Sequence, residues 1–170
     1  CRTAFEGGCN AVKLYFMLGL PTETDEDVIG IAQLAEKVYW TWKSYAVNKS
    51  RGLRITVSTS FFVPKPFTPF QWEAQITRDE YHRRVDLLRN SIKNKSIQYN
   101  WHEMETSYIE AVLARGDRRL GKLLETVWRK GARLDSWSEY FDFERWMEAF
   151  AETGIDPDFY ALRERPKDEI

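Results

Sequence analysis

The hydrophobic pattern at the start of the chain predicts one strand and one long helix. Residues 12–20 (VKLYFMLGL) form a nearly continuous apolar run without alternation, which is typical of a strand covered on both faces, as in a parallel sheet. After the Gly-Leu-Pro end of this run, Thr24 can act as a helix N-cap, with Asp27 three residues further on. Apolar residues at helical spacing over 28–42 then predict a helix that ends near Ala46.

The next segment predicts a second strand, a second helix and a short third strand. Residues 53–62 (LRITVSTSFF) are rich in β-branched and aromatic side chains, which favour a strand. They lead into VPKPFTPF, whose prolines favour an extended loop. Thr77 and Glu80 match a capping box, and apolar residues at helical spacing follow over 81–92. Residues 96–101 (SIQYNW) are a plausible third strand.

This order of elements predicts an α/β fold with about three parallel strands. The connections are long enough for crossovers between parallel neighbours, and such sheets bind ligands beyond the carboxyl ends of their strands. From residue 104 onwards the pattern changes to short helices. One is expected at 107–114, and a second follows Asp117, which would be its N-cap. A third is expected at 143–153, and a last short helix follows Asp156, with Pro157 as its first helical residue. The expected division is therefore 1–103 for the α/β part and 104–170 for a C-terminal helical extension.

Composition and charge exclude several classes of protein. With 43% apolar and 30% charged residues, the chain is not disordered. A net charge of −1 excludes a chain-wide basic field for nucleic acid, and no apolar run approaches the roughly 18 residues of a membrane span. The chain shows no signal peptide, and its two cysteines are too few for a disulfide framework. We therefore expect a cytoplasmic protein that does not contact a membrane.

The two ends of the chain suggest a piece of a longer protein. The first residue is Cys1 instead of Met, and the opening residues read like the end of a helix that runs into a strand. The last residues, RERPKDEI, form no finished element. We expect an excised fragment, although proteolytic maturation would also remove an initiator Met.

Two features at strand ends are candidates for ligand binding. Gly19, in the GLPTET turn, lets a ligand approach the backbone closely, and the N–H groups of the helix that follows favour anionic groups. Ser58 and Ser60 are spaced to face the same side of a strand and could present hydroxyls to a ligand. For each feature, a purely structural role explains the same residues. Lys65, within the prolines, suits either a pinned loop or an anion contact.

The remaining polar clusters do not predict a metal site. His102, Glu103 and Glu105 form no HExxH pattern, and the two acids could act as acid–base groups only if they are buried. Cys1 and Cys9 match no zinc or cluster spacing and are interpreted as ordinary thiols. The basic stretch 115–133 could touch RNA phosphates, but the nearby acids favour a solvated helix face.

Several segments together resemble the radical S-adenosylmethionine enzymes. YFMLGLPTETDEDV resembles the fifth-strand segment of their branch that includes methylthiotransferases and oxygen-independent coproporphyrinogen dehydrogenases, with a G-[LF]-P-G-[EQ]-T turn. STSFFVPKPFTPFQW, METSYIEAVLARGDRR, GARLDSW, FERWMEAF and GIDPDFYA resemble a bacterial group of uncharacterised proteins in which the radical-SAM barrel follows a domain that resembles cobalamin-binding domains. The resemblance covers residues 2–165, nearly the whole chain.

This resemblance implies an iron–sulfur enzyme that reductively cleaves S-adenosylmethionine to a 5′-deoxyadenosyl radical. The cofactors would be S-adenosylmethionine, a [4Fe–4S] cluster in the parent protein and, in some reactions, cobalamin for methyl transfer. Residues 1–103 would be the later part of a TIM-type (β/α) barrel. The CxxxCxxC cluster loop is absent from these residues, so it would belong to a missing N-terminal part of the same polypeptide, and the isolated chain is expected to be inactive.

The resemblance also assigns residues to the wall that binds S-adenosylmethionine, and it assigns no catalytic residue and no metal ligand in this chain. Three residues of this wall would lie near the adenine: Met17, Gly19 and Pro21. Glu23 would brace the turn. Three residues of the next strand would contact the nucleoside: Val57, Ser58 and Ser60. Two positions depart from the pattern. Thr22 replaces the second glycine of the turn, where a Cβ could limit the approach of a ligand, and Phe67 stands where the closest group has His.

Two other functions fit the same sequence. One is a binding module that keeps the half-barrel fold without chemistry. The other is an RNA-modifying methylthiotransferase, which predicts a functional basic face at 115–133. Neither is favoured by the group resemblance.

Overall fold

The computed structural model describes residues 1–168, and it divides into two compact units. The sheet unit contains residues 1–61 and 78–102, and the helical unit contains residues 62–77 and those from 103 onwards. The sequence-based division at 103/104 placed residues 62–77 with the strands. In the structure these residues pack with the helices, and each unit is described separately below.

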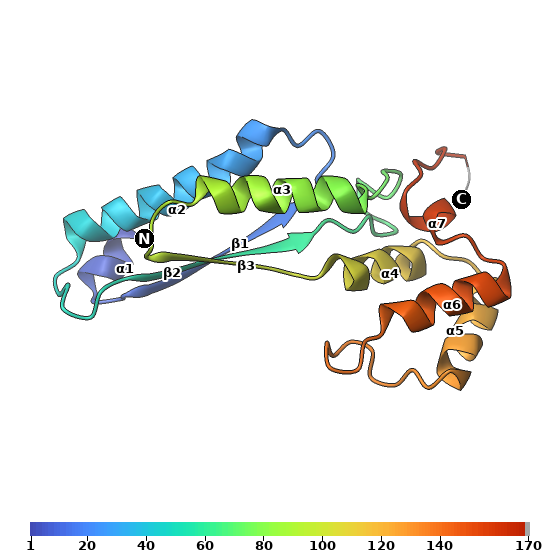
Figure 1. Ribbon diagram of the computed structural model, residues 1–170. Helices are drawn as coiled ribbons and strands as arrows, with labels where there is room; N and C mark the ends of the chain where they lie inside the picture. The colour runs from blue at the N-terminus through green and yellow to red at the C-terminus, as the bar shows by residue number, and fades with distance from the viewer. Residues whose placement is uncertain (169–170) are drawn as a thin grey trace. The chain divides into compact units, whose positions relative to one another are not determined.

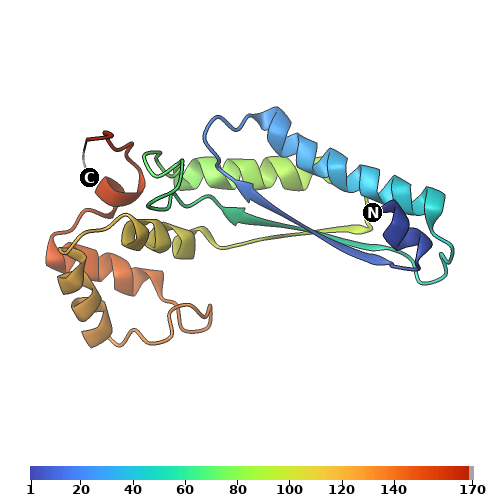
Figure 2. The same ribbon diagram turned by 180° about the vertical axis from the view of Figure 1, so that it is seen from behind.

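The sheet unit is an α/β layer with three parallel strands in the order β1-β2-β3. Figures 1 and 2 show from two sides that the long helices α2 and α3 lie on the same face of this sheet. The other face carries no helix of this unit. The elements are α1 (Arg2–Glu6), β1 (Ala11–Leu18), α2 (Asp25–Tyr45), β2 (Arg54–Phe61), α3 (Arg78–Ser91) and β3 (Ile97–Trp101).

The N-terminus of α2 is fixed by the capping box that the sequence predicts. The Thr24 hydroxyl accepts a hydrogen bond from the backbone N–H of Asp27, and the Asp27 carboxylate accepts one from the backbone N–H of Thr24. Two donors at the helix start are thereby satisfied, and the carboxylate lies at the positive end of the helix dipole. Helix α2 ends at Tyr45, close to the predicted end at Ala46.

The core of the sheet unit lies between the sheet and its two long helices. Ile55, Val57 and Phe61 point from β2 towards the helices, and they are buried together with apolar side chains of α2 and α3. Burial of each such side chain contributes about 1.5–3 kcal/mol. The buried Thr59 hydroxyl lies 2.8 Å from the Tyr99 hydroxyl, so this polar group of the core is satisfied.

The opposite face of the sheet is open within the described residues. Lys13, Tyr15 and Met17 alternate along β1 with the helix-facing residues and are exposed. The expectation that the run 12–20 is covered on both faces is therefore wrong for this unit. Lysine, tyrosine and methionine carry apolar stems or rings, which conceal the alternation in a hydrophobicity pattern.

The helical unit contains α4 (Met104–Ala114), α5 (Leu120–Arg129), α6 (Phe143–Thr153) and α7 (Pro157–Ala161). As predicted, α6 ends before Gly154 in the left-handed conformation, and the Asp156 carboxylate caps α7 by accepting from the N–H of Asp158. The prediction that Asp117 is the N-cap of α5 is wrong. Asp117 accepts from the N–H of Arg119 in a preceding turn, and Arg119 is the N-cap residue.

Gln75 joins the segment 62–77 to the helical unit. Its backbone N–H donates to the carbonyl of Ala161 at 2.9 Å, and its side-chain amide donates to the carbonyls of Phe62 and Ser107. Gln75 is 2% exposed, so these bonds satisfy donors that water does not reach. The segment is therefore part of the helical unit, not a free loop.

Candidate functional site

The open face of the sheet presents regular rows of mostly polar side chains. Residues paired across parallel strands point to the same side, so the register defines which side chains stand beside one another. From the amino to the carboxyl end of the strands, the rows are Ala11 and Arg54; Lys13, Thr56 and Gln98; Tyr15, Ser58 and Asn100; and Met17 and Ser60. Parallel sheets bind ligands beyond their carboxyl ends, so the last two rows are the candidate site.

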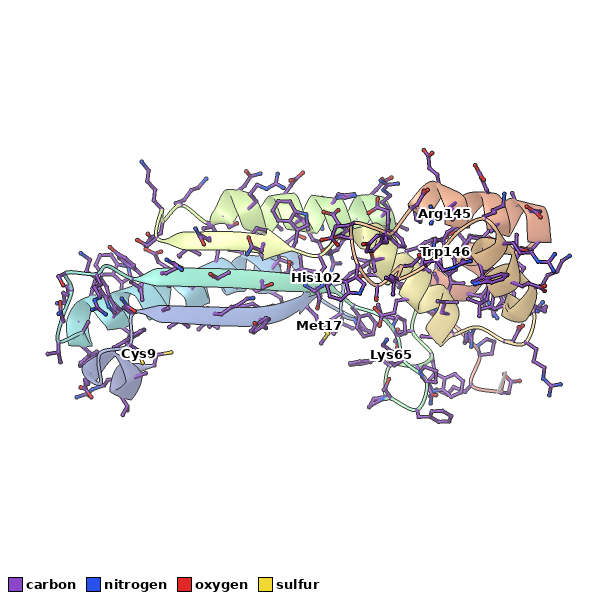
Figure 3. The ribbon with its side chains drawn as sticks, turned by 90° about the horizontal axis from the view of Figure 1, so that it is seen from below. Cys9, Met17, Lys65, His102, Arg145 and Trp146 are labelled. Carbon is purple, nitrogen blue, oxygen red and sulfur yellow. The ribbon has the colours of Figure 1, made fainter. Side chains whose placement is uncertain are left out.

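A hollow of about 350 Å³ lies at this carboxyl end. It is lined by Tyr15, Phe16, Met17, Ser58, Ser60 and His102. Figure 3 views the sheet from its open face, with Met17 and His102 labelled beside the ends of the strands. Pockets for small ligands usually measure about 300–1,000 Å³, so the hollow is at the lower end of that range.

The hollow combines an apolar surface with hydrogen-bonding groups. The side chain of Met17 is 48% exposed, and it stands beside Ser60 across the β1–β2 pairing. The hydroxyls of Ser58 and Ser60 face the same side, as the sequence predicts. An aromatic ring could lie against Met17 while polar groups on the same ligand reach these hydroxyls.

His102 also lines this hollow, although the sequence analysis considered it within a polar cluster that predicts no metal site. Its backbone N–H donates to the carbonyl of Thr59 at 3.0 Å, and its carbonyl accepts from the hydroxyl of Tyr81 at 2.9 Å. Tyr81 is fully buried, so both bonds fix the backbone that carries the imidazole. The predicted position of His102 directly after the third strand was the signal that could have placed it here.

The turn after β1 is held closed by Glu23. Gly19 has a φ of +89°, and its N–H donates to the Glu23 carboxylate at 2.9 Å. This bond is the brace that the family resemblance assigns to Glu23. The Gly19 amide is therefore occupied by a carboxylate of the chain itself, and Glu23 faces the turn.

The residues Leu20 to Glu23 form a tight turn with Pro21 as its second residue. The N–H of Glu23 donates to the carbonyl of Leu20 at 3.1 Å, and Thr22 has a φ of +64°. A turn with Pro in the second place and a positive φ in the third favours glycine in the third place. Thr22 therefore occupies a position whose backbone conformation favours glycine.

An ion-pair network anchors Glu23 to α3. The carboxylate of Glu23 pairs with the guanidinium of Arg84, and their side chains are 7% and 12% exposed. Arg84 also pairs with Glu80, which in turn accepts from Arg83. Hydrogen bonds from Arg83 and Arg84 lower the pKa of Glu80 to about 2. The turn is therefore tied to α3 of the sheet unit.

The structure brings together only some of the residues that the resemblance assigns to the S-adenosylmethionine wall. Met17, Ser58 and Ser60 line one hollow, whereas Gly19, Pro21 and Glu23 form the turn that follows β1. Val57 is fully buried among the helix-facing side chains of β2, so only its backbone remains available to a ligand on the open face.

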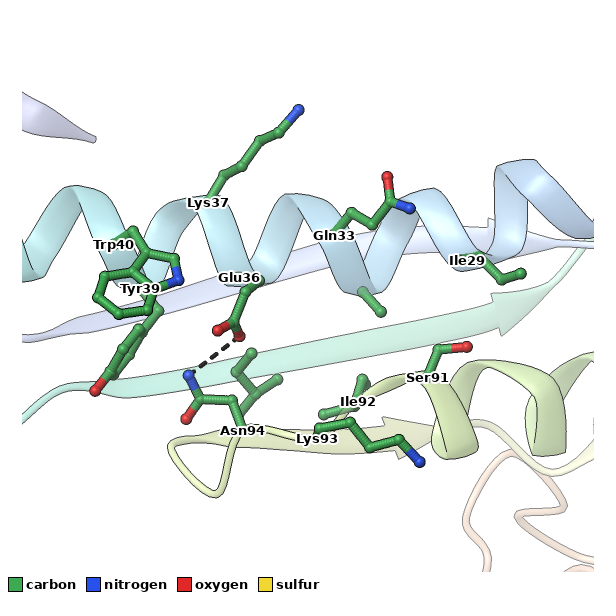
Figure 4. A pocket seen from close by; sticks show the side chains of 12 residues that line it. Ile29, Gln33, Glu36, Lys37, Tyr39, Trp40, Ser91, Ile92, Lys93 and Asn94 are labelled. Carbon is green, nitrogen blue, oxygen red and sulfur yellow. Dashed lines mark hydrogen bonds between the residues drawn. The ribbon is translucent and has the colours of Figure 1, made fainter.

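A larger hollow of about 770 Å³ lies elsewhere, beside α2 and the residues that follow α3. Figure 4 shows Trp40, Glu36 and Asn94 among its lining residues, with a hydrogen bond of 3.1 Å from the Asn94 amide to the Glu36 carboxylate. It lies near the amino ends of the strands, next to Ile97. In parallel sheets this end usually serves stability instead of ligand binding.

Part of the basic stretch 115–133 is buried or ion-paired within the helical unit. Arg115 is buried, and its guanidinium donates to the carbonyls of Ala161 and Arg163 at 2.8 and 2.7 Å. The other paired members are Arg119 with Asp117, Arg129 with Glu125, Lys130 with Glu148 and Glu152, and Arg133 with the carbonyl of Trp128. A solvated face with internal ion pairs describes this stretch better than a phosphate-binding surface.

Other polar candidates also have local partners. Lys65 pairs with Glu110 inside the helical unit, and Phe67, at the expected His position, is 96% exposed. Glu103 and Glu105 lie at the start of α4. Within residues 1–168, no group of three or more His, Cys, Asp or Glu side chains could hold a metal ion. No described helix combines the length and the apolar character that a membrane crossing requires.

Comparison with known proteins finds one informative similarity. The chain is 26% identical over 148 residues to an uncharacterized protein of Methanocaldococcus jannaschii. The match covers 87% of this chain and 31% of that protein, so the chain spans about a third of the length of the relative. No protein-family model matches the chain, and no solved structure matches it significantly.

Proposed function

We propose that this chain is the later part of the barrel of a radical S-adenosylmethionine enzyme, followed by a helical extension. In this proposal the hollow at the carboxyl ends of β1 and β2 forms part of the wall against which S-adenosylmethionine binds. The parent enzyme would cleave S-adenosylmethionine reductively, with cobalamin-assisted methyl transfer as one reaction that the resemblance allows.

The observations that support the proposal are the placement of both long helices on one face of a sheet with sequential strand order, and the polar side chains on its other face. One half of a doubly wound sheet also has both helices on one face, but its other face is covered by further helices, so the polar face favours a (β/α) barrel wall. A barrel wall turns its second face inwards. The hydroxyl and amide side chains of that face suit an interior that holds a ligand better than one filled by aliphatic packing.

The residues of the hollow fit the nucleoside part of S-adenosylmethionine. Met17 offers a polarizable surface for a purine ring, and Ser58, Ser60 and His102 offer partners for ring nitrogens and ribose hydroxyls. The braced turn after β1 would hold the end of the strand, and therefore Met17, in place. These residues would bind and orient the ligand and exclude water from one side of it.

No residues of this chain suit the [4Fe–4S] cluster that the proposed reaction needs. Cys1 and Cys9 are exposed thiols at the amino end of β1, and two thiolates do not hold a [4Fe–4S] cluster. Its ligands would come from outside these residues, and the cluster would supply the electron for cleavage when bound. No step of that chemistry is assigned to the side chains described here.

The proposal is tested with the product of the complete gene. The protein is purified anaerobically, reconstituted with iron and sulfide, and assayed for 5′-deoxyadenosine by liquid chromatography. We expect S-adenosylmethionine cleavage, with Ser58→Ala and Ser60→Ala each raising KM for S-adenosylmethionine by about 3–10-fold, the equivalent of one hydrogen bond. The matched control is Ser50→Ala, which removes an exposed hydroxyl from the loop before β2.

Two results would contradict the proposal. One is a complete protein without iron–sulfur absorbance and without cleavage, which would favour the half-barrel binding module. The other is active enzyme in which Ser58→Ala and Ser60→Ala behave like Ser50→Ala, with all three variants equally folded by circular dichroism. That result would move the S-adenosylmethionine wall away from this hollow.

A further inference from the structure

The helical unit contains a hollow of about 550 Å³ that has no part in the proposed function. Its walls are formed by α4, by the loop between α5 and α6, and by α6 itself. Five of the lining residues are apolar or aromatic: Ile109, Leu113, Ala114, Phe141 and Trp146. Pockets that bind small molecules usually measure about 300–1,000 Å³ and have mostly apolar walls, so this hollow has the size and the surface of such a pocket.

The charged side chains that line this hollow are both acids, Glu110 and Asp135. Glu110 already pairs with Lys65, and half of its side chain is exposed. Asp135 forms no ion pair with any residue among 1–168 and hydrogen-bonds only to an indole. The charge in the hollow therefore attracts a cation, and Asp135 is the acid that remains available to it.

Only one oxygen of the Asp135 carboxylate has a donor among residues 1–168. Oδ2 accepts from the indole N–H of Trp146, labelled in Figure 3, at 2.8 Å, and Trp146 is 5% exposed, so this bond fixes the carboxylate in the wall. Oδ1 is buried and accepts no hydrogen bond. A buried acceptor without a donor is unfavourable, above all when it belongs to a charged group. Because the terminal torsion of aspartate is soft, a small rotation is enough for Oδ1 to meet a donor in the hollow.

We propose that this hollow binds a small organic cation, with an ammonium group that contacts the Asp135 carboxylate and an apolar or aromatic body that packs against Ile109, Leu113 and Phe141. The volume favours a small molecule over one lysine or arginine side chain of a partner, which would fill only part of it. The inference does not depend on the proposed function, because every lining residue belongs to the helical unit.

The test uses three probes that share an indole ring and a short chain but differ in charge. Tryptamine is a cation, tryptophol is neutral and indole-3-propionate is an anion. Each is titrated into the product of the complete gene by isothermal titration calorimetry. We expect tryptamine to form a one-to-one complex, tryptophol to bind about 10-fold more weakly, and the anion to show no binding.

Asp135→Asn is the decisive variant, because it removes the charge but keeps an oxygen that can accept from Trp146. It should weaken tryptamine binding about 10-fold and change tryptophol binding by less than about 2-fold. The matched control is Glu144→Gln, which removes one negative charge from an exposed position in the first turn of α6 and should bind tryptamine as the unmodified protein does. Leu113→Trp places a larger ring at a position that is 40% exposed, and it should block binding by filling the hollow.

Circular dichroism establishes that the variants are folded. Equal affinity for the three probes would overturn the proposal, and so would equal weakening of tryptamine binding by Asp135→Asn and Glu144→Gln, which would show a response to net charge alone. A complete protein that binds no tryptamine, with a lysine or arginine of its own or only water at the Asp135 carboxylate, would overturn it as well. The S-adenosylmethionine assay decides the proposed function separately.

Discussion

Thr22 is strained in the turn that follows β1, and its replacement by glycine should stabilise the protein. Its φ of +64° lies in the left-handed region, which is unfavourable for a residue with a branched Cβ. The residue is exposed, so the substitution removes little packing. Thr22→Gly would also restore the glycine of the family pattern that the chain resembles.

The magnitude follows from two opposing effects. A left-handed backbone costs a residue with a Cβ about 1–2 kcal/mol, whereas glycine loses about 0.5–1 kcal/mol more backbone entropy on folding. We therefore expect Thr22→Gly to raise the free energy of unfolding by about 0.5–1 kcal/mol and Tm by roughly 2 °C. Thr22→Ala keeps the cost of the left-handed backbone but removes the branched side chain. Its free energy of unfolding should lie between those of the unmodified chain and Thr22→Gly.

Urea unfolding followed by circular dichroism measures this difference. The matched control is Thr24→Gly, the same substitution two residues later, where φ is −101° and the side chain caps α2. This control should lower stability by about 0.5–1 kcal/mol, because the cap is lost and no strain is relieved. If Thr22→Gly lowered stability as Thr24→Gly does, the assignment of strain to this turn would be wrong.

Three further substitutions probe the supports of the site and of the helical unit. Glu23→Gln should lower the unfolding free energy by about 1–3 kcal/mol in urea, because it removes one of the two carboxylates that pair with the half-buried Arg84, whereas exposed Glu26→Gln should change it by less than about 0.5 kcal/mol. The lowered pKa of Glu80, about 2 against 4.5, stabilises the fold above pH 4.5, and this contribution is lost as the pH falls towards 2. Thermal unfolding from pH 7 to 2.5 should show a loss of about 1 kcal/mol that Glu80→Gln abolishes. Gly116→Ala should cost about 1–3 kcal/mol in urea, because its Cβ would lie 2.9 Å from a carbonyl of α4, whereas Gly121→Ala, in open space on α5, should gain about 0.5 kcal/mol.

Local signals in the sequence predicted most of the elements. The capping pair Thr24 and Asp27 and the stop at Gly154 act within a few residues, so a linear pattern is sufficient to place them. The Asp117 prediction failed because the carboxylate also binds the guanidinium of Arg119, and the chain makes one more turn before α5 begins. The sequence offered no separate sign of that competition.

The parts of the site that could not be predicted depend on contacts between distant residues. Glu23 and Arg84 are 61 positions apart, and their contact leaves no pattern in one sequence. The position of His102 after the third strand can be read from the sequence, but its place beside Ser60 follows from the β2–β3 register. The i and i+2 spacing of Ser58 and Ser60, in contrast, is a local property of a strand, and it placed both hydroxyls on one face.

The central claim, that these residues are the later barrel wall of a radical S-adenosylmethionine enzyme, is tested most directly by the DNA upstream of the Cys1 codon. About 200 codons are sufficient for the remainder of a barrel. The account predicts, within them and in the same reading frame, a CxxxCxxC run directly after a predicted strand. An initiator codon immediately upstream of Cys1, with no cysteine triplet, would contradict it.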